Sequence, residues 1–136
     1  MKKFIIEDSF WDIIPEASIG IITVHGIDYH IKAENRYQPL LEEAEQKGLS
    51  WLTQDDFASN PVIAVWRDAF TRFKKKKGVR ASIEALLKRV YQGKHIGTIN
   101  PLVDIYNSIS LSYALPVGGE DIDKFEGNIR LTLADG

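Results

Sequence analysis

The sequence predicts a mixed α/β (α+β) domain in which helices pack on a mixed sheet. β-branched, apolar segments near both ends of the chain are typical of strands. Between them, apolar residues recur at helical spacing, and two of the helical segments open with an Asn-Pro pair that is typical of a helix start. Strands that flank helices in this order indicate a mixed layer fold. A chain of 136 residues fits one domain, so we expect residues 1–136 to form a single unit.

The first half of the chain is expected to hold two strands and a helix. Residues 4–6 and 19–24 are β-branched, and the second segment is apolar enough to be a buried strand of a central sheet. Residues 8–14 suit a short helical turn that ends at a proline. Residues 34–47 suit a helix, with Gly48 as its C-terminal stop.

The second half is expected to hold three helices and a closing strand. Residues 61–73 follow Asn60 as N-cap and carry an apolar stripe. Residues 82–91 show the strongest amphipathic pattern, and residues 101–112 repeat the Asn-Pro start. Residues 128–133 alternate with period two, which predicts a strand paired in the same sheet as residues 19–24.

The basic residues are concentrated in one stretch. Residues 67–94 carry ten Lys or Arg against two acidic residues, a net charge of +8, whereas the rest of the chain carries −10. Such a segment in an acidic protein suits a partner with a phosphate backbone, although it also suits a plain solvated helix face and loop. The candidate RNA-binding residues are Arg67, Arg72, Lys74, Lys75, Lys76, Lys77, Lys88, Arg89 and Lys94.

Several kinds of site are not expected. The chain has no cysteine, which excludes disulfides, thiolate–zinc sites and cysteine nucleophiles. The histidines His25, His30 and His95 have no acidic residue spaced to complete a metal site, so we expect neither a metal nor a cofactor. The longest apolar run, residues 19–24, is too short to cross a membrane, and the N-terminus turns acidic too soon for a signal peptide. These features predict a cytoplasmic protein.

Two strings in the second half carry a resemblance to a known family. One runs from Asn100-Pro101 through Asp104 and Asn107 to Ser110, and the other is Pro116-Val117-Gly118-Gly119-Glu120-Asp121. With them, the chain resembles the free-standing B3/B4-domain proteins. It is similar, more distantly, to the editing B3/B4 domain of the phenylalanine–tRNA ligase beta chain. Segments of the first half also recur in those proteins, so the resemblance covers nearly the whole chain.

The resemblance implies a B3/B4 α/β fold and a role connected with tRNA. The ligase domain hydrolyses tyrosine wrongly attached to the phenylalanine tRNA. Two pocket residues of the ligase differ here, because Gly118 stands in place of a histidine and Gly97 in place of an arginine. The family also continues with a further segment, so this chain is expected to be an incomplete version of the domain. It would then expose apolar surface that a second copy, in a homodimer, covers.

Three functions are compatible with these features. The first is a trans-editing hydrolase of mischarged aminoacyl-tRNA, an aminoacyl-tRNA deacylase rather than a complete ligase. The second is a non-catalytic tRNA- or RNA-binding module, and the third is a small-molecule or amino-acid binder. A hydrolase must position water and stabilise an oxyanion. The candidate catalytic residues are Asp104, Asn107, Ser110 and Glu120, and the candidate substrate-binding residues are Arg80, Asn100, Gly118 and Gly119.

Overall fold

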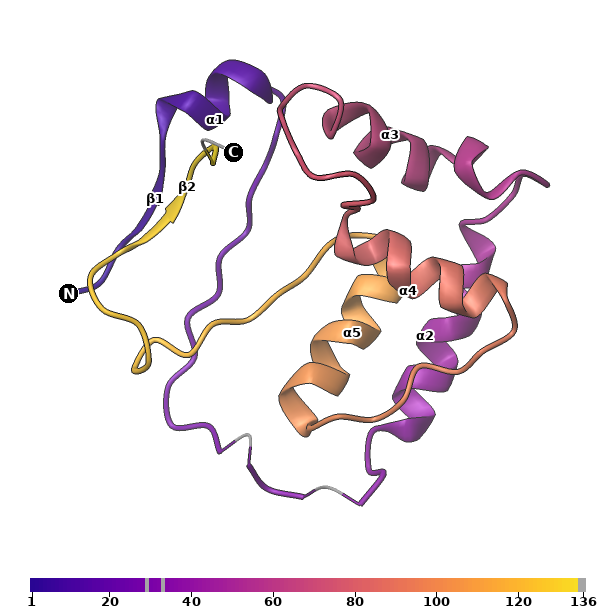
Figure 1. The fold of residues 1–136 in the computed structure, drawn as a ribbon. Coiled ribbons are helices and arrows are strands. Elements are labelled where there is room, and N and C mark those ends of the chain that lie inside the picture. The colour runs from indigo at the N-terminus through magenta and orange to yellow at the C-terminus, as the bar shows by residue number, and fades with distance from the viewer. Residues whose placement is uncertain (29, 33, 135–136) are drawn as a thin grey trace.

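The computed structural model describes residues 1–28, 30–32 and 34–134. Across these residues it combines helices with a small parallel sheet, which confirms the mixed α/β class. Strand β1 (Phe4–Ile6) leads into helix α1 (Asp8–Ile13), and strand β2 (Ile129–Leu131) returns beside β1 near the end of the chain (Figure 1). The two strands pair in parallel, with Phe4 opposite Ile129 and Ile6 opposite Leu131.

The other helices form a cluster on the far side of the molecule from the sheet (Figure 1). They are α2 (Gln38–Ser50), α3 (Pro61–Ala69), α4 (Ser82–Tyr91) and α5 (Pro101–Tyr113), with a short 3-10 helix η1 (Phe57–Ser59) before α3. The most extensive packing is between α2 and α5, and α4 packs on both. The buried core lies within this cluster and includes Leu41, Ala44, Ile63, Ile83, Leu87, Val90, Ile96 and Leu111.

Helix α2 begins and ends later than the predicted helix at residues 34–47. Glu34 and Asn35 have positive φ angles of 44° and 63°, which helical residues do not adopt. The helix starts at Gln38, so Pro39 lies in its first turn, where its missing N–H costs no hydrogen bond. The prediction that Gly48 ends the helix is wrong. Gly48 is buried inside α2 and gives room to Leu87 and Leu111, whose methyl groups would lie 3.2–3.3 Å from an added Cβ.

The strand predicted at residues 19–24 is not present, so the prediction of a central sheet that includes it is wrong. In the part of the chain that the structure describes, the sheet contains β1 and β2 alone. Residues 19–24 run without regular structure and are exposed along their length. A β-branched run becomes a strand only where a neighbouring strand accepts its backbone hydrogen bonds, so composition alone does not decide its structure.

The remaining helices lie close to their predicted positions. Helix α4 has the predicted bounds, and α5 extends one residue further than predicted. Helix α3 ends at Ala69 rather than at residue 73, because the chain tightens there into turns in which Thr71 N donates to Asp68 O and Arg72 N to Ala69 O. No helix in the described ranges is long and apolar enough to cross a membrane.

Candidate nucleic-acid interface

The polar residues that the sequence singled out on α5 serve mainly to hold the chain together. Asp104 is buried, and its Oδ1 accepts a hydrogen bond from Ile99 N at 2.8 Å. Ser110 is also buried and donates its hydroxyl to Leu115 O. Asn100 caps the helix, since its Oδ1 accepts from Val103 N at 3.0 Å. These groups therefore satisfy the backbone at the two ends of α5, as buried polar groups must.

The other proposed pocket residues do not join them in a cavity. Asn107 is half-buried on α5 and makes no side-chain hydrogen bond to another described residue. Gly118, Gly119 and Glu120 lie exposed in the loop after α5, where Gly119 approaches the ring of Tyr106. Neither the cavity at Tyr37 and Pro101 nor the cavity at Arg67 and Arg80 is lined by these residues.

Two of the predicted binding residues, Arg67 and Arg80, are brought together by a buried carboxylate. Glu84 lies in the first turn of α4 with its side chain only 6 % exposed. Arg67 reaches it from α3, with Nη2 at 2.6 Å and Nε at 3.2 Å from Oε1. Arg80 Nε lies 3.6 Å from the same oxygen. The hydrogen bond to Glu84 holds the pKa of Arg67 above its ordinary value, so the guanidinium of Arg67 stays charged at neutral pH.

The lysines at positions 74–77 form the loop between α3 and α4 and are all exposed. No ion pair ties any of them to an acidic side chain in the described ranges of the chain. Arg72, by contrast, is paired with Glu16 and with Asp68, the latter at 2.9 Å, and so links α1 and its following turn to the end of α3. The four lysines are therefore available to a partner, whereas Arg72 has an internal structural role.

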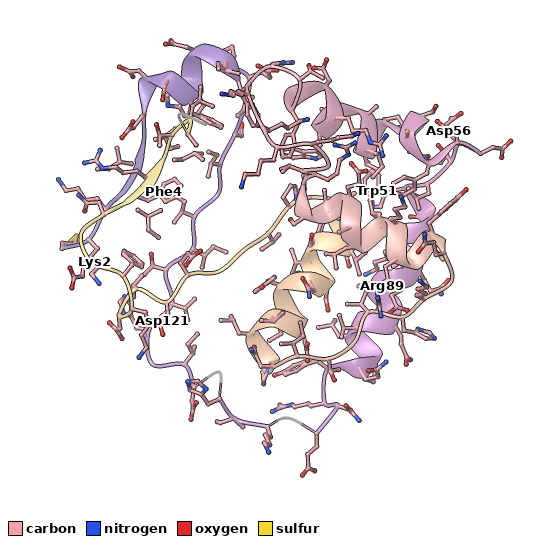
Figure 2. The ribbon with its side chains drawn as sticks, in the orientation of Figure 1. Lys2, Phe4, Trp51, Asp56, Arg89 and Asp121 are labelled. Carbon is pink, nitrogen blue, oxygen red and sulfur yellow. The ribbon has the colours of Figure 1, made fainter. Side chains whose placement is uncertain are left out.

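The remaining basic residues lie at the other end of α4. Arg89, labelled in Figure 2, lies in the last turn of α4. Its Nε donates to His95 O at 2.7 Å, which ties this turn to the loop that follows it. Lys88, in the last turn of α4, and Lys94, in the loop after it, are both exposed. The basic stretch thus presents charge at both ends of α4, with the lysine loop at the N-terminal end.

The pairing of Glu45 with His95 was not predicted from the sequence. Glu45 is buried on α2, where Oε1 accepts from Ile96 N at 2.7 Å and Oε2 lies 2.9 Å from His95 Nδ1. This hydrogen bond holds the pKa of the exposed His95 above its ordinary value. A signal was present, because Glu45 falls in the buried stripe of α2, one residue after Ala44 and four after Leu41.

The larger of these two cavities has a volume of about 380 Å³ and lies at the N-terminal end of α2. Its lining mixes acidic and basic side chains, so it favours no single charge; it comprises Asp28, Ile31, Lys32, Glu34, Arg36, Tyr37 and Pro101. The smaller cavity has a volume of about 190 Å³ and lies at Arg67 and Arg80. Within the described residues, no group of His, Asp and Glu side chains is placed to hold a metal ion.

A comparison with protein-family models finds one described as the B3/4 domain, which matches residues 65–136, just over half of the chain. The matched region holds most of α3, all of α4 and α5, strand β2 and the whole basic stretch from Arg67 to Lys94. No curated protein and no solved structure matches the chain.

Proposed function

Since the chain belongs to the B3/4 domain family, the domain found in the phenylalanyl-tRNA synthetase beta chain, we propose that it is a tRNA-binding module. The observation that carries this proposal is the exposed lysine loop at positions 74–77, which has no acidic partner among the described residues. It lies within the region that matches the family model, beside the guanidinium groups of Arg67 and Arg80.

Binding through this loop is electrostatic. Each lysine that neutralises a phosphate releases a counterion, so affinity falls steeply as salt is added. Lysine suits this role, because its charged group lies on a flexible side chain that can reach phosphates of an irregular RNA backbone. Such phosphate contacts do not select a base sequence. The lysines at positions 88 and 94 extend the charge to the other end of α4. An RNA fold that spans the length of this helix contacts both groups.

The geometry favours binding over hydrolysis. An editing hydrolase needs polar groups that are free to orient water and to stabilise an oxyanion. Asp104 and Ser110 are buried and already engaged with the backbone. Asn107 and Glu120 are the candidate catalytic side chains that stay accessible and have no hydrogen-bond partner among the described residues. Deacylation would therefore depend on these two side chains together with the backbone of the loop at Gly118 and Gly119.

The test is tRNA binding measured by fluorescence anisotropy over a salt series. The variant replaces all four lysines at positions 74–77 with glutamine. We expect the slope of log affinity against log salt to fall by about 3 units, because each lost phosphate contact removes roughly 0.7–0.9. Circular dichroism checks that the variant remains folded, as expected for an exposed loop.

A matched control removes the same charge elsewhere, through substitution of Lys3, Lys32, Lys47 and Lys124 by glutamine. It should change the slope far less than the loop variant. A second control, Asn107→Ala, should leave the slope unchanged, whereas it should abolish any release of tyrosine from mischarged tRNA. Equal slopes for the wild type and the loop variant would show that the lysines are only a solvated surface.

A further inference from the structure

The smaller cavity has a mainly basic lining. It lies between the C-terminal end of α3 and the start of α4 and has a volume of about 190 Å³, large enough for a phosphate group and part of its sugar. The lining residues are Arg67, Phe70, Thr71, Lys75 and Arg80. Three of these five carry a positive charge.

Both arginines are held in place while part of each remains accessible. Glu84 engages Nε and Nη2 of Arg67 and attracts Nε of Arg80, and Arg80 Nη1 donates to Val79 O at 2.9 Å. A guanidinium has five N–H donors, so these contacts leave several donors on each group free. The side chains are 36 % and 41 % exposed. The conformational entropy of these two long side chains is therefore already reduced in the free protein, so ligand binding does not have to order them.

The charge of the cavity matches a dianion. Arg67, Arg80 and Lys75 contribute three positive charges, and the buried Glu84 that contacts both arginines contributes one negative charge. The hydroxyl of Thr71 already donates to Asp68 O at 2.6 Å, so the arginines and the lysine supply the donors. Phe70 gives one apolar wall, against which a ribose or a base can pack.

We propose that this cavity binds the terminal phosphate of an RNA, a phosphomonoester, in a fork formed by Arg67 and Arg80. A terminal phosphate carries close to two negative charges at neutral pH, whereas an internal phosphodiester carries one. Planar guanidinium groups bind phosphate oxygens in pairs, which explains why this position has arginines while the neighbouring loop has lysines. The inference rests on the proposed function and specifies which part of the RNA the protein holds.

The test compares two short RNAs of identical sequence, one with a 5′-phosphate and one with a 5′-hydroxyl, each labelled at the 3′ end. The ratio of their affinities cancels the contribution of the backbone. We expect the full-length protein to prefer the phosphorylated RNA about tenfold, since a charge-assisted contact of this kind adds roughly that factor. Arg80→Gln should reduce the preference below twofold. Arg80→Lys should restore only part of it, because lysine lacks the fork.

Arg36→Gln is the matched control, because it removes an exposed arginine far from this cavity in the sequence and should keep the tenfold preference. A preference below twofold in the wild type would overturn the proposal, as would a tenfold preference that survives in Arg80→Gln. A normal salt slope for tRNA with no effect of the 5′-phosphate would leave the proposed function intact and remove this site.

A second measurement covers the case in which RNA does not bind at all. Inorganic phosphate is then titrated into the protein while NMR follows the Nε–H signals of Arg67 and Arg80. Saturable shifts of both signals that Arg80→Gln abolishes would support an anion site even though the proposed function had failed. Signals that stay still at millimolar phosphate would overturn the inference.

Discussion

Glu45 is a buried carboxylate, and its surroundings satisfy it with hydrogen bonds. Its two oxygens take one donor each, from the backbone at Ile96 and from the ring of His95. Burial of a charged group is costly unless such partners are present. The pair therefore joins helix α2 to the loop between α4 and α5, a connection between segments about fifty residues apart in sequence. Its strength depends on the protonation state of His95.

The first prediction is that stability decreases as the pH rises through the pKa of His95. The folded pKa of this group is raised, so its contribution to stability is fully present below the unfolded value, near 6.5. The contribution is lost as the pH passes the raised folded pKa. NMR titration of the His95 ring should give a pKa above about 6.5. In Glu45→Gln the pKa should fall toward that ordinary value, since the amide still accepts from Ile96 but carries no charge.

Thermal melts across pH 5 to 9 give the matching readout. The wild type should lose more of its melting temperature over this range than Glu45→Gln does. Identical pH profiles for the two proteins would mean that the contact between His95 and Glu45 does not form in solution.

At the scale of elements, α2 depends on a glycine in its interior. A glycine in a helix is destabilising relative to alanine by about 1 kcal/mol, so its presence at position 48 needs a compensating reason. The reason is packing, because Leu87 of α4 and Leu111 of α5 occupy the space that a side chain would fill. Helices α2, α4 and α5 therefore meet at Gly48, and Leu87 and Leu111 are both part of the buried core.

The corresponding prediction is that Gly48→Val destabilises the fold by about 1–3 kcal/mol, the usual cost of overpacking. Urea unfolding followed by circular dichroism measures this. Gly20→Val is the control, because an added Cβ there meets no atom within 4 Å, and it should change stability by less than about 0.5 kcal/mol. Equal effects of the two substitutions would contradict the close approach of the helices at Gly48.

At the scale of the whole molecule, the apolar stripe of α5 faces outward. The buried side of this helix carries Asp104, Ser108 and Leu111, whereas Leu102, Ile105 and Ile109 are 36–48 % exposed. The apolar side chains of residues 19–24 are exposed as well. Exposed apolar side chains gathered on one face of a helix are typical of an interaction site.

We propose that a second copy of the chain covers the α5 stripe. A two-fold axis brings the same apolar patch of each copy together, which is the commonest form of homodimer. Sedimentation equilibrium should show a dimer at micromolar concentration. The double variant Ile105→Glu with Ile109→Glu should be a monomer, while Val65→Glu, which alters an exposed apolar residue on α3, should remain a dimer. A wild-type protein that is monomeric at all concentrations would exclude this interface.

The sequence by itself determined the mixed fold class, the family and the helices that have clear start signals. Asn100 and Pro101 mark the start of α5 by local chemistry, so no tertiary information was needed to place it. Local pattern was less reliable for side chains. Asn60 is the N-cap residue of α3 as predicted, but its side chain makes no hydrogen bond to that helix. The side chain instead accepts from Gln54 N and donates to Phe57 O in the preceding loop.

Only the tertiary structure decided the partners of each segment. Residues 19–24 have strand composition but form no strand, because β structure needs a second chain segment at the right distance and composition does not specify one. Tertiary contacts also decided the orientation of α5. Its polar residues are buried, where they bind backbone groups next to the ends of the helix, and its apolar stripe is exposed. The proximity of Arg67, Arg80 and Glu84 also follows from the docking of α3 beside α4. Charge and helical periodicity are properties of neighbours in sequence, whereas hydrogen-bond satisfaction and burial are settled between residues that only folding brings together.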